Sequence, residues 1–199
     1  MNQDGVRVET SGGIVRGVRI DGVRTWRGIP FGSAERWKAP RPVRWQGIWL
    51  ADEYGNVAPQ TDYNWKDEVI GDEDCLNLDI VRPDTNATLP VVVFLHGGGF
   101  FAGASHTAVL RGHNFAKELD VVYVALNFRL GALGYVDMSS LEVPDAFGCE
   151  ANPATRDQIM ALNWVQENIE RFGGDPDNVV LMGESAGGTS AAALMAIPE

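Results

Sequence analysis

Hydrophobic and polar positions follow one pattern before Leu89 and another after it. In the first part, short β-like runs alternate with glycine-rich stretches, which predicts antiparallel strands at the edge of a larger sheet. Residues 31–60 are rich in Pro, Gly and Trp without a steady period, so we expect irregular surface structure there. Segment 73–83 alternates apolar and polar residues and predicts a half-buried strand. The β-like runs are Val6–Glu9, Ile14–Val18 and Val23–Trp26.

After Leu89 the apolar runs become continuous, as expected of parallel strands that are buried on both faces. Residues 114–119 predict a short helix, and Asn152 as N-cap with Pro153 at the first helical position opens a longer one that ends at Gly173. The alternation of strands and helices predicts an α/β protein with a mostly parallel sheet. The continuous runs are Val91–Leu95, Val121–Leu126 and Val179–Met182. The apolar stripe of the longer helix comprises Ile159, Leu162, Val165, Ile169 and Phe172.

The last apolar run breaks into Gly183-Glu184-Ser185-Ala186-Gly187 and continues as small helix-forming residues. This G-x-S-x-G pattern between a strand and a helix predicts a nucleophile elbow. A serine at such a corner has a strained backbone, and glycines beside it let neighbouring backbone segments approach closely. The helix that follows directs its amide-rich N-terminus toward Ser185, where its partial positive charge favours a developing oxyanion.

A second glycine motif, His96-Gly97-Gly98-Gly99-Phe100, follows the first continuous apolar run. Successive glycines at a strand end let backbone N–H groups face one point, which suits an oxyanion-hole loop. A phosphate-binding loop is the alternative, but no Gly-Lys-Ser/Thr follows. The elbow in the same chain therefore favours the oxyanion hole.

The amino-acid composition is that of a globular domain, and its net charge makes some classes of binding partner unfavourable. The 199 residues are 45% hydrophobic and 22% charged, and the excess of 27 Asp and Glu over 16 Lys and Arg gives a formal net charge of −11. This charge disfavours nucleic acid and anionic membranes as partners. The first residues show no secretory signal, and two cysteines alone do not make a disulfide scaffold, so we expect a cytoplasmic location.

These motifs together resemble the type-B carboxylesterase and cholinesterase family of α/β-hydrolases. The resemblance implies an α/β-hydrolase fold with N-terminal antiparallel strands, formed by residues 1–199 as the N-terminal part of one domain and truncated after the elbow helix. The resemblance extends over nearly the whole chain and includes motifs for which no catalytic role is predicted. The motifs are Gly28-Ile29-Pro30-Phe31, Glu73-Asp74-Cys75-Leu76, His96–Phe100, Asn127–Gly131, Asp157-Gln158 and Phe172–Gly187.

The resemblance also implies roles for individual residues. Ser185 would be the nucleophile that forms an acyl-enzyme with a small carboxylic ester, and the backbone amides of Gly98, Gly99 and Ala186 would stabilise the oxyanion. Glu184 would add a negative charge near the site or serve only in packing. No cofactor is expected, and no cluster of metal ligands is visible in the sequence.

Two pairs, Arg36 with Glu73 and Arg129 with Asp157, are similar to the structural salt bridges of the family. The cysteine that commonly pairs with the one in the Glu-Asp-Cys-Leu motif is absent here, so we expect Cys75 to be a free buried thiol. Trp65 stands at the offset of the choline-binding tryptophan of cholinesterases. We interpret it as a packing or surface residue, because cation–π recognition needs a complete aromatic cage.

A serine nucleophile needs a base, and in α/β-hydrolases the acid and the histidine follow the serine in sequence. Here His96, His106 and His113 all precede Ser185, so we expect a complementing C-terminal segment to supply both groups. We also expect the strand before Ser185 to expose an apolar edge. Two alternatives stay open at this point: an inactive truncated remnant, and a non-catalytic binding or adhesion module of the cholinesterase-like type.

Overall fold

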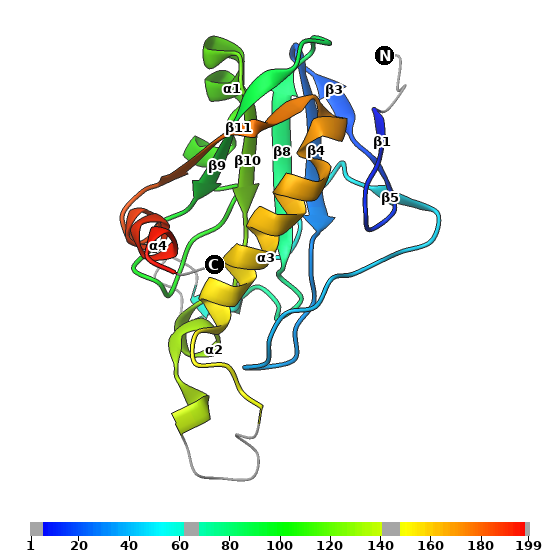
Figure 1. Ribbon diagram of the computed structural model, residues 1–199. Coiled ribbons are helices and arrows are strands. Elements are labelled where there is room, and N and C mark those ends of the chain that lie inside the picture. Colours follow the sequence, from blue (N-terminus) through cyan, green and yellow to red (C-terminus); the bar gives the residue numbers. More distant parts are fainter. Residues whose placement is uncertain (1–5, 62–67, 141–147, 198–199) are drawn as a thin grey trace.

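A six-stranded mixed sheet forms the centre of the computed structural model, which describes residues 6–61, 68–140 and 148–197 (Figure 1). The strand order is β11-β9-β10-β8-β4-β3. Its strands are β3 (Val18–Ile20), β4 (Val23–Pro30), β8 (Asn77–Pro83), β9 (Leu89–Leu95), β10 (Val122–Leu126) and β11 (Gly174–Gly183).

The parallel centre expected from the continuous apolar runs is confirmed. Strands β9, β10 and β11 run parallel, with Val93 of β9 aligned with Val124 of β10 and with Leu181 of β11. Strand β8 pairs antiparallel with β10 and with β4, so the N-terminal strands extend the sheet on one side. The prediction that 73–83 is half-buried is wrong: six of the seven residues of β8 are buried, because β8 lies inside the sheet and elements cover both of its faces.

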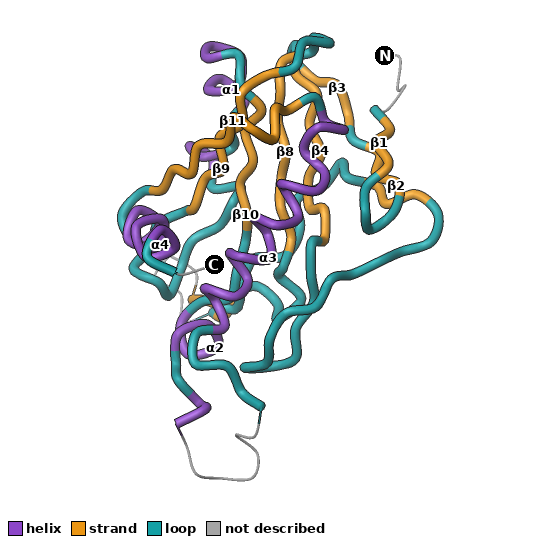
Figure 2. The backbone as a smooth tube through the Cα atoms, in the orientation of Figure 1, coloured by secondary structure: helices purple, strands orange, loops and turns teal. Residues whose placement is uncertain are grey.

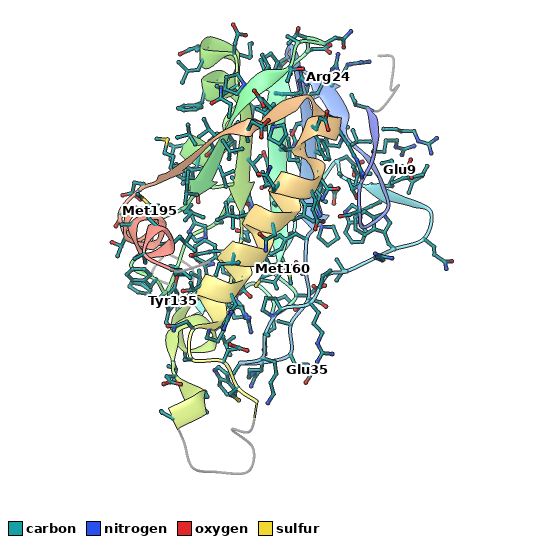
Figure 3. The ribbon with its side chains drawn as sticks, viewed as in Figure 1. Glu9, Arg24, Glu35, Tyr135, Met160 and Met195 are labelled. Atoms are coloured by element: carbon teal, nitrogen blue, oxygen red, sulfur yellow. The ribbon has the colours of Figure 1, made fainter. Side chains whose placement is uncertain are left out.

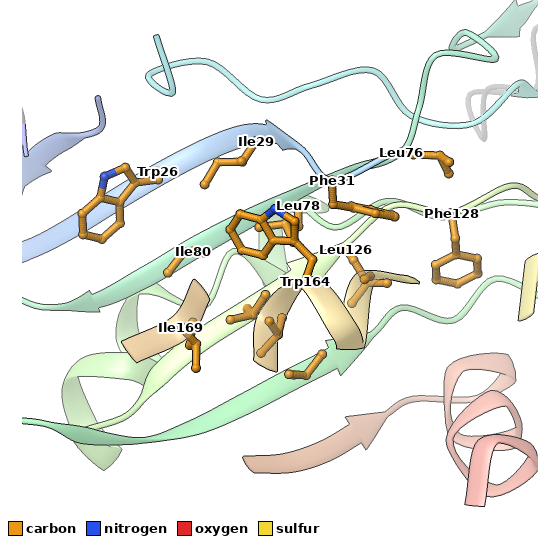
Figure 4. Packing of buried hydrophobic residues seen from close by; sticks show 14 of the residues in the cluster. Trp26, Ile29, Phe31, Leu76, Leu78, Ile80, Leu126, Phe128, Trp164 and Ile169 are labelled. Carbon is orange, nitrogen blue, oxygen red and sulfur yellow. The ribbon is translucent and has the colours of Figure 1, made fainter. Parts of the chain in front are cut away.

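Helices cover the two faces of the sheet, α3 (Pro153–Asn168) on one and α1 (His113–Leu119) on the other (Figures 1 and 2). Alternate residues of β9 contribute to the two sides: Val93 packs in the cluster that contains Trp164 of α3, and Phe94 packs in the cluster that contains Ala116 of α1. Figure 4 shows the α3 side, where Trp164 packs over the strands among aromatic and aliphatic side chains.

Helix α3 begins at Pro153 and continues as a 3-10 turn that ends at Gly173, whose φ of 78° is the left-handed cap expected there. Asn152 occupies the N-cap position, but its side chain makes no capping hydrogen bond. Of the predicted stripe, Ile159 and Leu162 are only partly buried. Their place in the core is taken by Ala154, Asp157, Gln158, Ala161 and Trp164, so the buried face is more polar than the apolar period indicated.

The N-terminal segment forms two structures rather than one. Strands β1 (Arg7–Glu9) and β2 (Ile14–Arg16) pair antiparallel as expected, but they lie in a separate sheet with β5 (Ile48–Leu50), which pairs parallel with β2. Only β3 and β4 join the large sheet. The prediction that 31–60 is irregular is therefore wrong at β5, which a sequence period cannot reveal in three residues.

The remaining described elements are short. They are β6 (Gln60–Thr61), β7 (Val69–Ile70), α2 (Gly131–Tyr135), α4 (Ala186–Met195) and the 3-10 turns Ala108–Leu110, Met138–Ser140 and Ile169–Phe172. In the part of the chain that the structure describes, no helix is long and apolar enough to cross a membrane.

Strand β11 lies at the edge of the sheet, as expected, and no strand of the described residues pairs with the other side of its backbone. Val180 is 54% exposed and Met182 is 41% exposed. At its start, the pairing with β9 shifts between Gly174 and Val179, so the predicted turn there is an irregular part of the strand. The edge therefore presents apolar side chains beside free backbone groups.

Candidate active site

Ser185 stands at the corner between β11 and α4 with φ of 53° and ψ of −121°. A positive φ is uncommon for a residue with a side chain, and such backbone strain costs about 1–3 kcal/mol. Ser185 is exposed, and among the described residues its hydroxyl has no hydrogen-bond partner. The corner thus presents an accessible serine hydroxyl on a strained backbone.

Two glycines make this corner possible because the backbone segments around it almost touch. A Cβ atom on Gly183 would lie 2.3 Å from the carbonyl carbon of Gly187, and a Cβ atom on Gly187 would lie 2.0 Å from the carbonyl oxygen of Leu95. The amide of Gly187 also donates to the carbonyl of Glu184 over 2.8 Å. These contacts give a physical reason for both glycines of the G-x-S-x-G pattern.

The register of the sheet brings the elbow next to the second glycine motif. Gly183 of β11 aligns with Leu95, the last residue of β9, and the Glu184 amide donates to the Leu95 carbonyl over 3.3 Å. His96 and the glycine loop, which comprises residues 97–103, follow directly. The two motifs lie far apart in the sequence, yet the pairing of β9 with β11 places them at the same end of the sheet.

The glycine loop itself has three successive positive φ angles, 113° at Gly98, 61° at Gly99 and 68° at Phe100. The amides of Phe101 and Ala102 donate to the Gly98 carbonyl over 3.2 and 3.0 Å, which closes the loop on itself. A closed cavity, too small to hold a water molecule, adjoins it and is lined in part by Gly97, Phe100 and Ala186. The structure therefore brings the amide-bearing start of α4 and the glycine loop to one cavity.

Tyr135 and Ser190 line the same cavity from α2 and α4. Figure 3 labels Tyr135 near α2, and Met195 farther along α4, where it is 87% exposed. Burial raises the pKa of Tyr135, so its hydroxyl is protonated at neutral pH. The sequence motifs did not indicate either Tyr135 or Ser190, because both come to the cavity only through the packing of the helices.

Glu184 is exposed, and its carboxylate lies against the glycine loop: a Cβ atom added to Gly97 would be 2.1 Å from Glu184 Oε2. A negative charge beside the loop attracts a cation or repels an anion that approaches this end of the sheet. Glu184 is therefore a neighbour of the candidate site by geometry, as its position beside Ser185 indicated.

The three histidines occupy different surroundings. His96 is buried and stacks on Phe128, with ring centroids 4.6 Å apart, whereas His106 is half-buried and stacks on Tyr54. His113 is the first residue of α1. In the described part of the chain none of them hydrogen-bonds Ser185, and no group of three or more His, Cys, Asp or Glu side chains there could hold a metal ion.

A buried polar layer lies behind the glycine loop. Asp79 of β8 accepts hydrogen bonds from the Ser105 hydroxyl over 2.6 Å and from the Gly28 amide over 2.8 Å. Burial raises the pKa of Asp79 to about 6, although both hydrogen bonds oppose the rise. Asn127 accepts from the Ser105 amide over 2.8 Å and donates to Asn77 over 3.0 Å. The alternating pattern of β8 gave no sign that its polar residues would be buried with distant partners.

The two ion pairs of the sequence analysis are formed in very different surroundings. Arg129 and Asp157 have side chains that are 4% and 0% exposed, and two hydrogen bonds of 2.8 and 2.6 Å join these side chains. Arg36 and Glu73 have side chains that are 55% and 38% exposed. The hydrogen bond from Arg36 lowers the pKa of Glu73. The first pair therefore belongs to the core, and the second lies at the surface.

Cys75 is buried and free, as expected, and burial raises its pKa to about 12. A thiol with so high a pKa is not a nucleophile at neutral pH. Trp65 lies outside the described residues.

Comparison with known proteins assigns this arrangement to a family. Residues 4–199 match the Carboxylesterase family. The chain belongs to this family. The para-nitrobenzyl esterase of Bacillus subtilis is 41% identical over 96% of the carboxylesterase chain and 40% of its own length. The phenmedipham hydrolase of Pseudarthrobacter oxydans is 34% identical over 95% of the chain and 39% of its own length.

Solved structures agree with the sequence relatives. A para-nitrobenzyl esterase structure superposes on the carboxylesterase chain with a TM-score of 0.88 at 42% identity, over 96% of this chain and 41% of the other. A Geobacillus stearothermophilus carboxylesterase gives a TM-score of 0.87 at 36% identity, over 96% of this chain and 40% of the other. The fold is thus that of an α/β-hydrolase, and the chain spans about two-fifths of the length of these relatives.

Proposed function

We propose that this carboxylesterase chain carries the nucleophile and the oxyanion donors of a serine carboxylic-ester hydrolase. The observation that carries the proposal is the corner at Ser185, where a strained and exposed serine stands at the end of the sheet that also bears the glycine loop. The family membership and the names of its relatives, which are esterases and hydrolases, support ester chemistry.

In the proposed first step, Ser185 Oγ attacks the carbonyl carbon of the ester. A bond forms between Oγ and carbon, and the electron pair of the C=O bond moves to the oxygen. The amides of Gly98, Gly99 and Ala186 are the proposed donors to this oxyanion, and loss of one such donor typically lowers the rate about 10²–10³-fold. Collapse of the tetrahedral species expels the alcohol, and water then releases the acid from the acyl-serine.

The hydroxyl of Ser185 must lose its proton during the attack, and a histidine usually accepts it. None of the three histidines of this chain hydrogen-bonds Ser185 in the described region. We therefore propose that a complementing segment supplies the histidine and the acid, and that it docks at the end of the sheet where β11 has its free edge.

The test is hydrolysis of p-nitrophenyl acetate by the chain alone and by the chain mixed with a segment encoded by the adjoining reading frame. We expect hydrolysis in the mixture and loss of at least about 10³-fold in Ser185→Ala, because removal of the nucleophile leaves only binding and oxyanion stabilisation. Thr189→Ala, which alters a hydroxyl one turn farther along α4, is the matched control and should keep the activity.

Activity in the mixture that Ser185→Ala does not reduce would contradict the proposal. Absence of hydrolysis in both samples would favour an inactive remnant or a binding module instead. Serine-dependent hydrolysis by the chain alone would keep the nucleophile but would show that the base is within the 199 residues.

A further inference from the structure

Two side chains hold the glycine loop at its two ends: His96 contacts Gly97, and Gln60 contacts Gly103. We propose that they are positioning residues that set the direction of the Gly98 and Gly99 amides. The inference rests on the proposed function, since it is there that these amides act as oxyanion donors. Neither residue needs to touch the substrate for this role.

His96 acts on the loop through the Gly97 carbonyl. Its Nδ1 lies 2.8 Å from the Gly97 oxygen, and since a carbonyl only accepts, Nδ1 carries the hydrogen. The side chain is 2% exposed, and burial lowers its pKa, which keeps the ring neutral. Nε2 is then an acceptor, and it has no partner among the described residues. Stacking on Phe128 fixes the plane of the ring.

The Gly97 carbonyl and the Gly98 N–H belong to one planar trans peptide unit, in which they point in opposite directions. A hydrogen bond that fixes the carbonyl therefore fixes the N–H as well. The same reasoning applies to the next unit: the Gly98 carbonyl accepts from the amides of Phe101 and Ala102, and this fixes the Gly99 N–H. Both proposed donors are thus oriented through the carbonyl on the other side of their own peptide plane.

Gln60 holds the end of the loop through the backbone of Gly103. Its Oε1 accepts from the Gly103 amide over 2.8 Å, and its Nε2 donates to the Gly103 carbonyl over 2.9 Å. Nε2 also donates to the Ala58 carbonyl over 3.0 Å, and the residue is 9% exposed. The side-chain amide therefore pairs with Gly103 much as a neighbouring strand would pair with it.

Gly103 is the residue at which the two contacts meet. A Cβ atom there would lie 2.3 Å from both the Gly97 oxygen and His96 Nδ1, and its φ is 122°. Only glycine leaves room for the hydrogen bond between His96 and Gly97. Gln60 keeps Gly103 packed against that hydrogen bond, so a change at Gln60 reaches the Gly98 amide without contact with it.

The test is NMR spectroscopy of the 199-residue chain labelled with ¹⁵N. The nitrogen shifts of His96 should show hydrogen on Nδ1 and none on Nε2 at neutral pH. The His96→Asn variant places an amide nitrogen where Nδ1 lies, whereas His96→Gln places it near Nε2. We expect His96→Gln to shift the Gly98 and Gly99 amide resonances and His96→Asn to restore them.

For Gln60, the variant Gln60→Met keeps the length of the side chain and removes its hydrogen bonds. We expect it to raise the exchange rate of the Gly103 amide about tenfold or more and to shift the Gly98 amide resonance. Gln166→Met is the matched control, because the Gln166 side chain makes one exposed hydrogen bond to Pro176 and lies on α3, away from the loop.

Hydrogen on Nε2 of His96 in the wild-type chain would overturn the proposal. So would unchanged Gly98 and Gly99 resonances in both His96→Gln and Gln60→Met. These readouts do not require catalysis, so they separate this inference from the proposed function, which depends on Ser185→Ala in the hydrolysis assay. In the active mixture, Gln60→Met should lower kcat about tenfold and leave KM within about twofold.

Discussion

Polar side chains are buried in one region of the molecule and exposed in another. The buried region comprises the polar layer and the Arg129–Asp157 ion pair, and in it Asp79, Arg129 and Asp157 each make several hydrogen bonds. At the elbow, Glu184 and Ser185 are exposed, and the Ser185 hydroxyl has no partner in the described structure. The first region holds the backbone in place, and the second presents reactive groups on a strained corner.

Substitutions in the buried region should affect folding, and substitutions at the elbow should affect chemistry. Removal of a single group from the buried region should lower the free energy of unfolding, because it leaves a buried partner without its hydrogen bonds. Substitution of elbow residues should change the free energy of unfolding little, and relief of the backbone strain there should stabilise the fold.

The largest effect is expected for Arg129→Met, which leaves the Asp157 carboxylate buried without its cation. The carbonyls of Lys38 and Pro153 also lose a donor. We expect the free energy of unfolding to fall by about 3–5 kcal/mol. Urea denaturation followed by circular dichroism measures this change, and a loss below about 1 kcal/mol would show that the pair does not hold the core.

The next effect depends on pH and concerns Asp79. Its pKa is raised to about 6 from the ordinary value of 3.8, so the folded state binds more protons than the unfolded state between these values. Stability from this group therefore falls as pH rises from about 4 to about 6, by about 3 kcal/mol in total. Asp79→Asn removes the charge and keeps an acceptor for Gly28 and a donor for Ser105.

We expect Asp79→Asn to be about as stable as the wild type near pH 4.5 and more stable than it at pH 8. The measurement is the difference between the two unfolding free energies across this range, in which the shared contributions of the histidines cancel. A difference that does not change with pH would show that burial does not raise the pKa of Asp79.

A smaller effect of opposite sign is expected at the elbow. Ser185→Gly removes the side chain from a position with φ of 53° and should raise the unfolding free energy by about 1 kcal/mol, after allowance for the greater entropy of glycine in the unfolded chain. Ser185→Ala keeps the strain and is the control. If the two variants have equal melting temperatures, the corner stores no measurable strain.

The smallest effect is expected for Arg36→Met, the same chemical change as Arg129→Met made in an exposed ion pair. Water screens an exposed pair, so the unfolding free energy should be almost unchanged in urea denaturation followed by circular dichroism. If Arg36→Met lowers the free energy of unfolding as much as Arg129→Met does, exposure does not explain how the two ion pairs differ in their contribution to stability.

The parts of the fold that depend on local sequence could be predicted. The continuous apolar runs of β9 and β10 indicated buried parallel strands, and the glycines around Ser185 indicated a strand-to-helix corner. Each of these features has its cause within a few residues: a β-branched run suits a strand covered on both faces, and a corner with close backbones needs glycine.

The parts that depend on distant contacts could not be predicted. Asp79 is buried because Ser105 and Gly28 supply donors, and Gln60 reaches Gly103 across 43 residues. The pairing of β5 with β2 likewise joins two distant segments, and no sequence pattern indicates that they pair. Polar residues with such partners look like surface residues in the sequence, so the supporting part of the candidate site is visible only in three dimensions.

The free edge of β11 also has a practical consequence. Its register with β9 places the row of unpaired backbone groups beside the elbow, so whatever pairs with this edge arrives next to Ser185. Two proteins of interest, one fused to this chain and the other to a complementing segment, would bring the segment to the edge when they bind each other. Under the proposed function, colour from a p-nitrophenyl ester would then report their encounter, and Val180 and Met182 would be the positions at which to tune how readily the halves associate unaided.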